Sequence, residues 1–422
     1  MEDVPVSKAA SGDIPAHLPA RLVITLWDFS WYTQAGPGEP FADLDRAFAE
    51  AAERGYNTVR ICAAPLYLFG PNALPADLAI SGFGPRPGGG SFGDGTRWYN
   101  VTGGYSVPLL QRLLALFAAA RRHGFVVILS SWEYQQSPAF AADDRWWRAI
   151  DAVPFAERMD ALASANITLL HVLDDNGCLD LVAFLELHNE VDFSRVPTDG
   201  ATLERAVQTV SRQFPGILTT VSYGKPPHPD WESLPADLQV GQFHIYAYGV
   251  LDALQQTIDI RGSGTEDFPN TALRGLLRPG APAWADAGRP EGWRFDATVV
   301  TDQMLYGYDN VDPDGWDLWL YDRYAPFRDR MHGEIRSRVA AAAAWGRQHS
   351  TPVVFGEGWV GYTPLHAGFE EGPVGKDLAE TGLHAAVDNG AWGAVLSSNA
   401  APQHPLWADV AWQRRASAIL LG

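Results

Sequence analysis

Short apolar runs alternate with longer helical patterns along almost the whole chain. The runs lie near residues 22, 58, 125, 181, 218, 240, 353 and 391, and each is typical of a strand buried on both faces. Most precede a segment with apolar residues three and four positions apart; two of these, 41–54 and 107–123, end at Gly55 and Gly124. Eight such units predict an α/β protein, most simply a (β/α)8 TIM barrel. A doubly wound open sheet is the alternative.

The chain length and the alternation of predicted strands and helices together predict one large domain. The chain has 422 residues, which a barrel with insertions accommodates. Residues 1–20 are predicted to form an N-terminal extension, and residues 21–422 a single barrel domain. Two segments interrupt this alternation: 65–104, which is rich in glycine and proline, and 247–325, which is longer than ordinary loops. We expect both to be loop insertions at the C-terminal face, where barrels build their sites.

Charge and composition exclude several classes of partner. The chain has 31 Lys and Arg against 50 Asp and Glu, a net charge of −19, and so acidic a surface repels phosphate backbones and anionic lipids. We therefore expect no nucleic-acid or membrane partner. No stretch reaches the ~20 apolar residues of a membrane span, and no secretory signal pattern is seen, which favours a cytoplasmic protein. Two cysteines and unpatterned histidines predict no metal and no other cofactor.

Two glutamates each follow directly on a predicted strand. Glu190 ends the run Leu-His-Asn-Glu after the fourth strand, and Glu357 lies in Phe-Gly-Glu-Gly-Trp after the seventh. In a barrel these strand ends share one face, so the two carboxylates would oppose each other across the mouth. Such a pair performs glycoside hydrolysis: one carboxyl protonates the leaving oxygen, and the other attacks the anomeric carbon or activates water. Either glutamate alone is more often a solvated loop residue or an ion-pair partner.

The order of these motifs resembles the clan A glycoside hydrolases, which are retaining (β/α)8 enzymes. Family 5, with its cellulases, mannanases and β-mannosidases, is the most similar group. The resemblance implies that Glu190 is the acid/base and Glu357 the nucleophile. It also implies that Asn189, directly before the acid/base, hydrogen-bonds the 2-hydroxyl of the sugar.

Three further residues match family positions. The resemblance implies that Arg60, in the second strand, holds the nucleophile ionised. It places His244 near the acid/base and brings the hydroxyl of Tyr246 to the nucleophile. A charge inside an apolar strand must be paired, which agrees with the role given to Arg60. For His244, a packed and satisfied histidine is the alternative.

The chain departs from the family pattern after strands three and eight. Many members have a histidine near the end of strand three, where this chain reads Ser-Ser-Trp-Glu-Tyr-Gln at 130–135; many have a tryptophan after strand eight, where it reads Ser-Ser-Asn at 397–399. The candidate sugar contacts are therefore Trp132, Glu133, Gln135, Trp359 after the nucleophile, and Trp27 at the end of strand one. Glu133 as an ion-pair partner and Trp27 as core packing are the alternatives.

Long loops on the active face favour a pocket over an open cleft, and hence exo-action on short oligosaccharides. The region around Trp132 resembles mannan-directed members of family 5. The sequence thus predicts a retaining β-glycosidase working by double displacement, in particular an exo-acting β-mannosidase on mannosyl-β-1,4-N-acetylglucosamine-type substrates. The alternatives are a β-glucosidase and an endo-β-mannanase or glucanase. A non-catalytic sugar-binding barrel is the alternative of another class, and the presence of both glutamates argues against it.

Overall fold

The computed structural model describes residues 13–422 except 76, 227–230 and 265. Of the predicted N-terminal extension, 1–20, residues 1–12 lie outside the described part of the chain. None of the helices in the described part combines the length and the apolar character that a membrane span requires.

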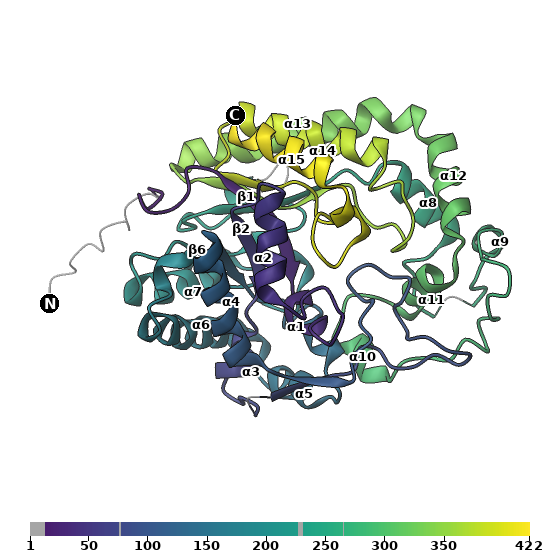
Figure 1. Ribbon diagram of the computed structural model, residues 1–422, viewed down its shortest axis with the longest axis horizontal. Coiled ribbons are helices and arrows are strands. Elements are labelled where there is room, and N and C mark those ends of the chain that lie inside the picture. Colours follow the sequence, from purple (N-terminus) through teal and green to yellow (C-terminus); the bar gives the residue numbers. More distant parts are fainter. Residues whose placement is uncertain (1–12, 76, 227–230, 265) are drawn as a thin grey trace, which may run out of the picture.

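A parallel sheet of nine strands forms the centre of the molecule, and helices surround it (Figure 1). Its order is β7-β6-β5-β2-β1-β11-β10-β9-β8. The strands are β1 (Leu22–Asp28), β2 (Thr58–Cys62), β5 (Val126–Ser130), β6 (Val182–Glu186), β7 (Thr219–Thr220), β8 (Ser222–Tyr223), β9 (Gly241–Tyr246), β10 (Val353–Trp359) and β11 (Gly393–Val395). The two end strands, β7 and β8, are separated by Val221 alone, so they are halves of one strand and the sheet closes on itself. The predicted (β/α)8 barrel is confirmed.

The large helices follow the strands much as the periodicity indicates. They are α2 (Leu44–Glu53), α4 (Leu109–His123), α6 (Arg158–Asp175), α7 (Gly200–Gln213), α13 (Arg328–His349), α14 (Pro373–Asp388) and α15 (Val410–Leu421). The first begins three residues later than predicted because the side chain of Asp43 accepts a hydrogen bond from the Arg46 amide and caps it. Gly124 ends α4 in the left-handed conformation, as predicted.

The segment 65–104 is more ordered than a long loop. It contains helix α3 (Pro65–Phe69) and strand β3 (Asp77–Ile80), which pairs antiparallel with β4 (Tyr105–Pro108). Residues 107 and 108 therefore belong to a strand, and the predicted helix at 107–123 begins two residues late.

The second insertion, 247–325, is helical. It holds α8 (Val250–Ile258), α9 (Thr271–Arg274), α10 (Gly292–Asp296), α11 (Asp302–Asn310) and α12 (Pro313–Arg323). Figure 1 shows these helices gathered on one side of the barrel. Asp309 of α11 accepts hydrogen bonds from the amides of Gly93 and Gly95, each at 2.8 Å, so the two insertions are joined.

The outer face of β10 packs tightly against α14. Trp359, at the end of β10, is 1% exposed, and a Cβ added to Gly382 in α14 would overlap its ring. We therefore expect Gly382→Ala to lower the free energy of unfolding by about 1–3 kcal/mol, measured by urea denaturation.

Gly333→Ala is the matched control. It lies inside the neighbouring helix α13, where an added Cβ meets nothing, so it should raise stability by up to about 1 kcal/mol. Equal effects of the two substitutions would contradict this account of the packing.

Candidate active site

The guanidinium of Arg60 lies at the floor of the barrel mouth and is fully buried. Its Nε and Nη2 donate to both oxygens of Glu186 in β6, at 2.8 and 2.7 Å. Its Nη1 donates to Oε1 of Glu357 in β10 at 2.8 Å, and Nη2 also donates to Oδ1 of Asn189 at 2.5 Å. The ring of Trp132 covers the guanidinium at 4.5 Å. One buried cation therefore orients two carboxylates and one amide.

Glu357 is held by a second donor on its other oxygen. The hydroxyl of Tyr246, in β9, donates to Oε2 at 2.9 Å and lies 2.8 Å from Oγ of Ser398. Oγ of Ser398 in turn accepts from the Gly358 amide at 2.9 Å. Both carboxylate oxygens thus accept a hydrogen bond from a fixed donor, which holds the carboxylate in one orientation.

Glu190 lies in a less polar environment. Its oxygens accept from Nε2 of Gln135 and contact Nδ1 of His244, both at 2.9 Å. Its backbone is in the left-handed region, with φ 41°, and its amide donates to Oγ of Ser222 at 2.8 Å. Burial raises the pKa of the carboxyl to about 7, although the Gln135 hydrogen bond and the charge of Arg60 oppose the rise. This carboxyl can hold a proton near neutral pH.

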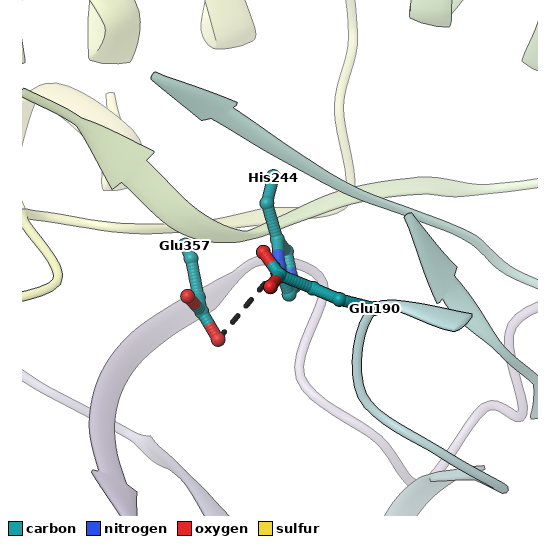
Figure 2. Close-up of side chains that lie close together, drawn as sticks. All are labelled: Glu190, His244 and Glu357. Atoms are coloured by element: carbon teal, nitrogen blue, oxygen red, sulfur yellow. Dashed lines mark hydrogen bonds and ion pairs between the residues drawn. The ribbon is translucent and has the colours of Figure 1, made fainter. Parts of the chain in front are cut away.

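The side chains of Glu190, Glu357 and His244 point toward one another from three strand ends (Figure 2). One oxygen of each glutamate and one ring nitrogen of the histidine lie within 4.8 Å of one another. Burial lowers the pKa of His244, so its ring is neutral at pH 7 and can donate to Glu190. Three such groups could also share a metal ion, but the Arg60 guanidinium, 2.8 Å from Glu357, already supplies the positive charge there.

A pocket of about 740 Å³ opens above these carboxylates. Five of the residues named from the sequence line it: Trp132, Gln135, Asn189, Glu190 and Glu357. Both insertions form its walls. The first contributes Trp98 and Tyr99, and the second contributes Val300 and Tyr308. The insertions therefore narrow the barrel mouth into a pocket.

Three of the proposed sugar contacts lie in the protein interior instead. Trp27 is fully buried and packs on Phe41 and Phe48, with ring centroids 5.2 and 4.6 Å away. The reason is strand alternation: its neighbours in β1, Leu26 and Asp28, line the pocket, so Trp27 points outward.

Glu133 and Trp359 are also structural. The Glu133 carboxylate accepts from the amides of Leu66 and Tyr67 at 2.9 and 2.7 Å and so holds the start of α3. Its other hydrogen bonds come from Ser131 and Trp146, so no arginine pairs with it among the residues that the structure describes. The Trp359 ring turns toward α14, and its Nε1 donates to the Val395 carbonyl at 3.3 Å.

Sequence reasoning missed Glu186, Ser398, Trp98 and Tyr362, and it placed Asp28 at the barrel mouth, at the end of the first strand, without giving it a role. Glu186 carried a usable signal, since it is a charge inside the apolar run of the fourth strand, as Arg60 is in the second. Ser398, Trp98 and Tyr362 carry no such signal, because contacts distant in the sequence place them at the pocket.

A (β/α)8 barrel that presents two glutamates at its strand ends, in a pocket lined by aromatic and polar groups, is a glycoside hydrolase. The chain belongs to the cellulase-like family, whose model, described as sugar-binding cellulase-like, matches residues 24–196 and 302–421. The fold is that of clan A and resembles glycoside hydrolase family 5, as the motifs indicate. No curated protein sequence matches the chain.

The chain is similar to several solved structures. A protein from Parabacteroides distasonis, provisionally assigned as a glycoside hydrolase, has 18% identity and a TM-score of 0.66, over 95% of this chain and 93% of its own. A family 5 mannosidase from Rhizomucor miehei has 12% identity and a TM-score of 0.49, over 98% of both chains. An endo-1,4-β-D-mannanase from Thermotoga petrophila has 15% identity and a TM-score of 0.43, over 89% and 87%.

Glu186 is a positioning residue whose loss leaves the buried Arg60 only partly neutralised. We expect Glu186→Gln to lower the free energy of unfolding by about 3–5 kcal/mol in urea denaturation, because the substitution removes a charge and retains the volume. Asp160→Asn is the control, since it removes an exposed ion pair with Arg205 and should change stability little. Equally small losses in both variants would contradict a central role for the Arg60–Glu186 pair.

Proposed function

We propose that the protein is a retaining β-glycosidase that removes the terminal sugar from short β-linked oligosaccharides. The observation that carries the proposal is the approach of the Glu190 and Glu357 carboxylates to within 4.8 Å. Retaining enzymes hold their carboxyl groups about 5–5.5 Å apart, whereas inverting enzymes separate them by about 6.5–9.5 Å to admit a water molecule.

In the first half of the reaction, Oε of Glu357 attacks the anomeric carbon as the glycosidic bond breaks. The leaving oxygen takes the proton of Glu190, and a covalent glycosyl–enzyme ester forms. Arg60 and Tyr246 hold the nucleophile with both oxygens oriented. Asn189, fixed by Arg60 and by Oε1 of Gln135, presents its amide group to the 2-hydroxyl.

In the second half, the ionised Glu190 takes a proton from water, and the resulting hydroxide displaces Glu357 from the anomeric carbon. Two inversions give net retention, and both carboxyl groups return to their starting states. Because burial favours the protonated form of Glu190, the free enzyme is ready for the first step near neutral pH.

The pocket supports exo-action. Residues of both insertions lie across the barrel mouth, and such walls restrict the site to the end of a chain. The segment around Trp132 resembles mannan-directed members of family 5, which favours a terminal β-mannoside. We propose mannosyl-β-1,4-N-acetylglucosamine-type oligosaccharides as substrates.

A panel of nitrophenyl β-mannoside, β-glucoside and β-galactoside tests the function, together with mannosyl-N-acetylglucosamine. We expect cleavage of the mannosides with the β-anomer formed first, as followed by proton NMR. Glu357→Ala should lower kcat by at least about 10⁴-fold because it removes the nucleophile. Glu53→Ala, on the exposed surface of α2, is the control and should retain full activity.

Other outcomes of this panel identify the alternatives. Preferred cleavage of the glucoside would indicate a β-glucosidase, and cleavage of long chains alone an endo-enzyme. No turnover of any substrate, accompanied by sugar-induced thermal stabilisation, would indicate a sugar-binding barrel. An initial α-anomer would contradict the retaining mechanism.

The pH profile tests the assignment of Glu190 as the acid. Since the acid must be protonated, kcat/KM should fall about tenfold per pH unit above about pH 7. The Gln135 hydrogen bond lowers the pKa of Glu190, so Gln135→Leu should move this alkaline limb to higher pH, whatever its effect on the maximum rate. A limb that stays in place or moves downward would refute the link between Gln135 and the acid.

A further inference from the structure

A third carboxyl, that of Asp28, lies at the pocket beside the proposed nucleophile. It ends β1, lines the pocket, and is 2% exposed. Its backbone is in the left-handed region, with φ 41°, a conformation that a non-glycine residue seldom adopts without cause. No step of the proposed mechanism uses this carboxyl.

Two donors fix the Asp28 carboxyl. Oδ1 accepts from the amide of Ser30, and Oδ2 accepts from Nε2 of Gln403 at 3.2 Å. The residue after Gln403, His404, packs its ring against the edge of Trp98 at 5.3 Å. Asp28 and Trp98 therefore lie at the same end of the pocket, joined by the segment that follows β11.

This end is where the terminal sugar would bind. Gly224, Lys225 and Phe193 line the pocket beside Glu190, and Gly224 directly adjoins its carboxylate. Because Glu190 protonates the leaving oxygen, that side receives the departing part of the substrate. Asp28 lines the pocket close enough to Glu357 to be affected by its charge, and it would therefore lie beside the sugar whose anomeric carbon is attacked.

The surroundings of Asp28 keep it neutral near pH 7. Burial raises its pKa to about 8, the hydrogen bonds from Ser30 and Gln403 oppose the rise, and the nearby charge of Glu357 adds to it. Tyr99 is a second titratable group near Asp28; burial raises its pKa above the usual value, so it too is uncharged. A neutral carboxyl group can donate a hydrogen bond as well as accept one.

We propose that Asp28 is a specificity-determining residue that hydrogen-bonds one ring hydroxyl of the terminal sugar on the side away from the anomeric carbon. The inference rests on the proposed function and narrows its substrate class. The terminal sugar must carry a free 3- or 4-hydroxyl, and a chain extended or substituted at that position is excluded from the pocket.

Deoxy sugars test this contact directly. The probes are the nitrophenyl glycoside that the wild type cleaves best and its 3-deoxy and 4-deoxy derivatives. In the wild type, one derivative should lose about 10- to 100-fold in kcat/KM, the range for a hydrogen bond to a buried polar group. In Asp28→Ala the parent glycoside should fall by a similar factor, and the penalty for that derivative should disappear.

Two further variants separate contact from structure. Asp28→Asn retains a neutral donor and should keep more activity than Asp28→Ala, whereas Asp322→Asn, exposed on α12, should behave as the wild type. A deoxy penalty that is the same in the wild type and Asp28→Ala would overturn the proposal, even if overall activity falls.

Failure of the proposed function gives a different result. In that case the wild type cleaves no glycoside, and calorimetric titration of mannose and glucose into wild type and Asp28→Ala tests the contact without turnover. The contact would be supported if mannose or glucose bound more weakly to Asp28→Ala than to the wild type, and if the wild type lost the same affinity for the 3- or 4-deoxy sugar. Unchanged affinity would overturn it.

Discussion

One buried guanidinium, that of Arg60, determines the geometry of the pocket floor. It binds Glu186, Asn189 and Glu357, which follow it in the chain by 126, 129 and 297 residues. A buried charge is tolerated only when its partners stay in place, so β2, β6 and β10 must keep their relative positions at the barrel mouth. The requirement that stabilises the barrel centre is the same one that orients Glu357, the proposed nucleophile. A shift of any of these strands would leave the charge of Arg60 unpaired and would also change the orientation of Glu357.

Most of the barrel follows from the sequence because doubly buried strands are continuous apolar runs, and this signal is local. The insertions do not, because their elements are short and depend on distant partners. The loop of Gly93 and Gly95, for example, is held by Asp309, more than two hundred residues later. Strand β4 went unnoticed at 105–108 since its pairing with β3 leaves no periodic pattern.

The candidate site also divides into residues that local sequence signals predict and residues that only tertiary contacts place. Position after a strand predicted that Glu190 and Glu357 would share one face, and the family motif added Asn189, Arg60, His244 and Tyr246. The structure brings these side chains together. Position alone does not give side-chain direction, which alternates along a strand. Trp27 therefore points into the helix layer while Leu26 and Asp28 reach the pocket. Trp98 lies in a segment without periodicity, and only its tertiary contacts place it in the wall.

The contacts of Arg97 govern the order in which the molecule can be assembled. Its guanidinium binds the carbonyls of Thr363 and Ala367 and the carboxylate of Glu371, 274 residues farther along. During synthesis, the first half of the barrel is therefore made long before the residues that complete the pocket wall around Arg97. Contacts of such long range form slowly, so Arg97 and its neighbours lack these partners until the last part of the chain arrives. A nascent or truncated chain that ends before residue 363 would lack the partners of Arg97 and therefore a finished pocket wall.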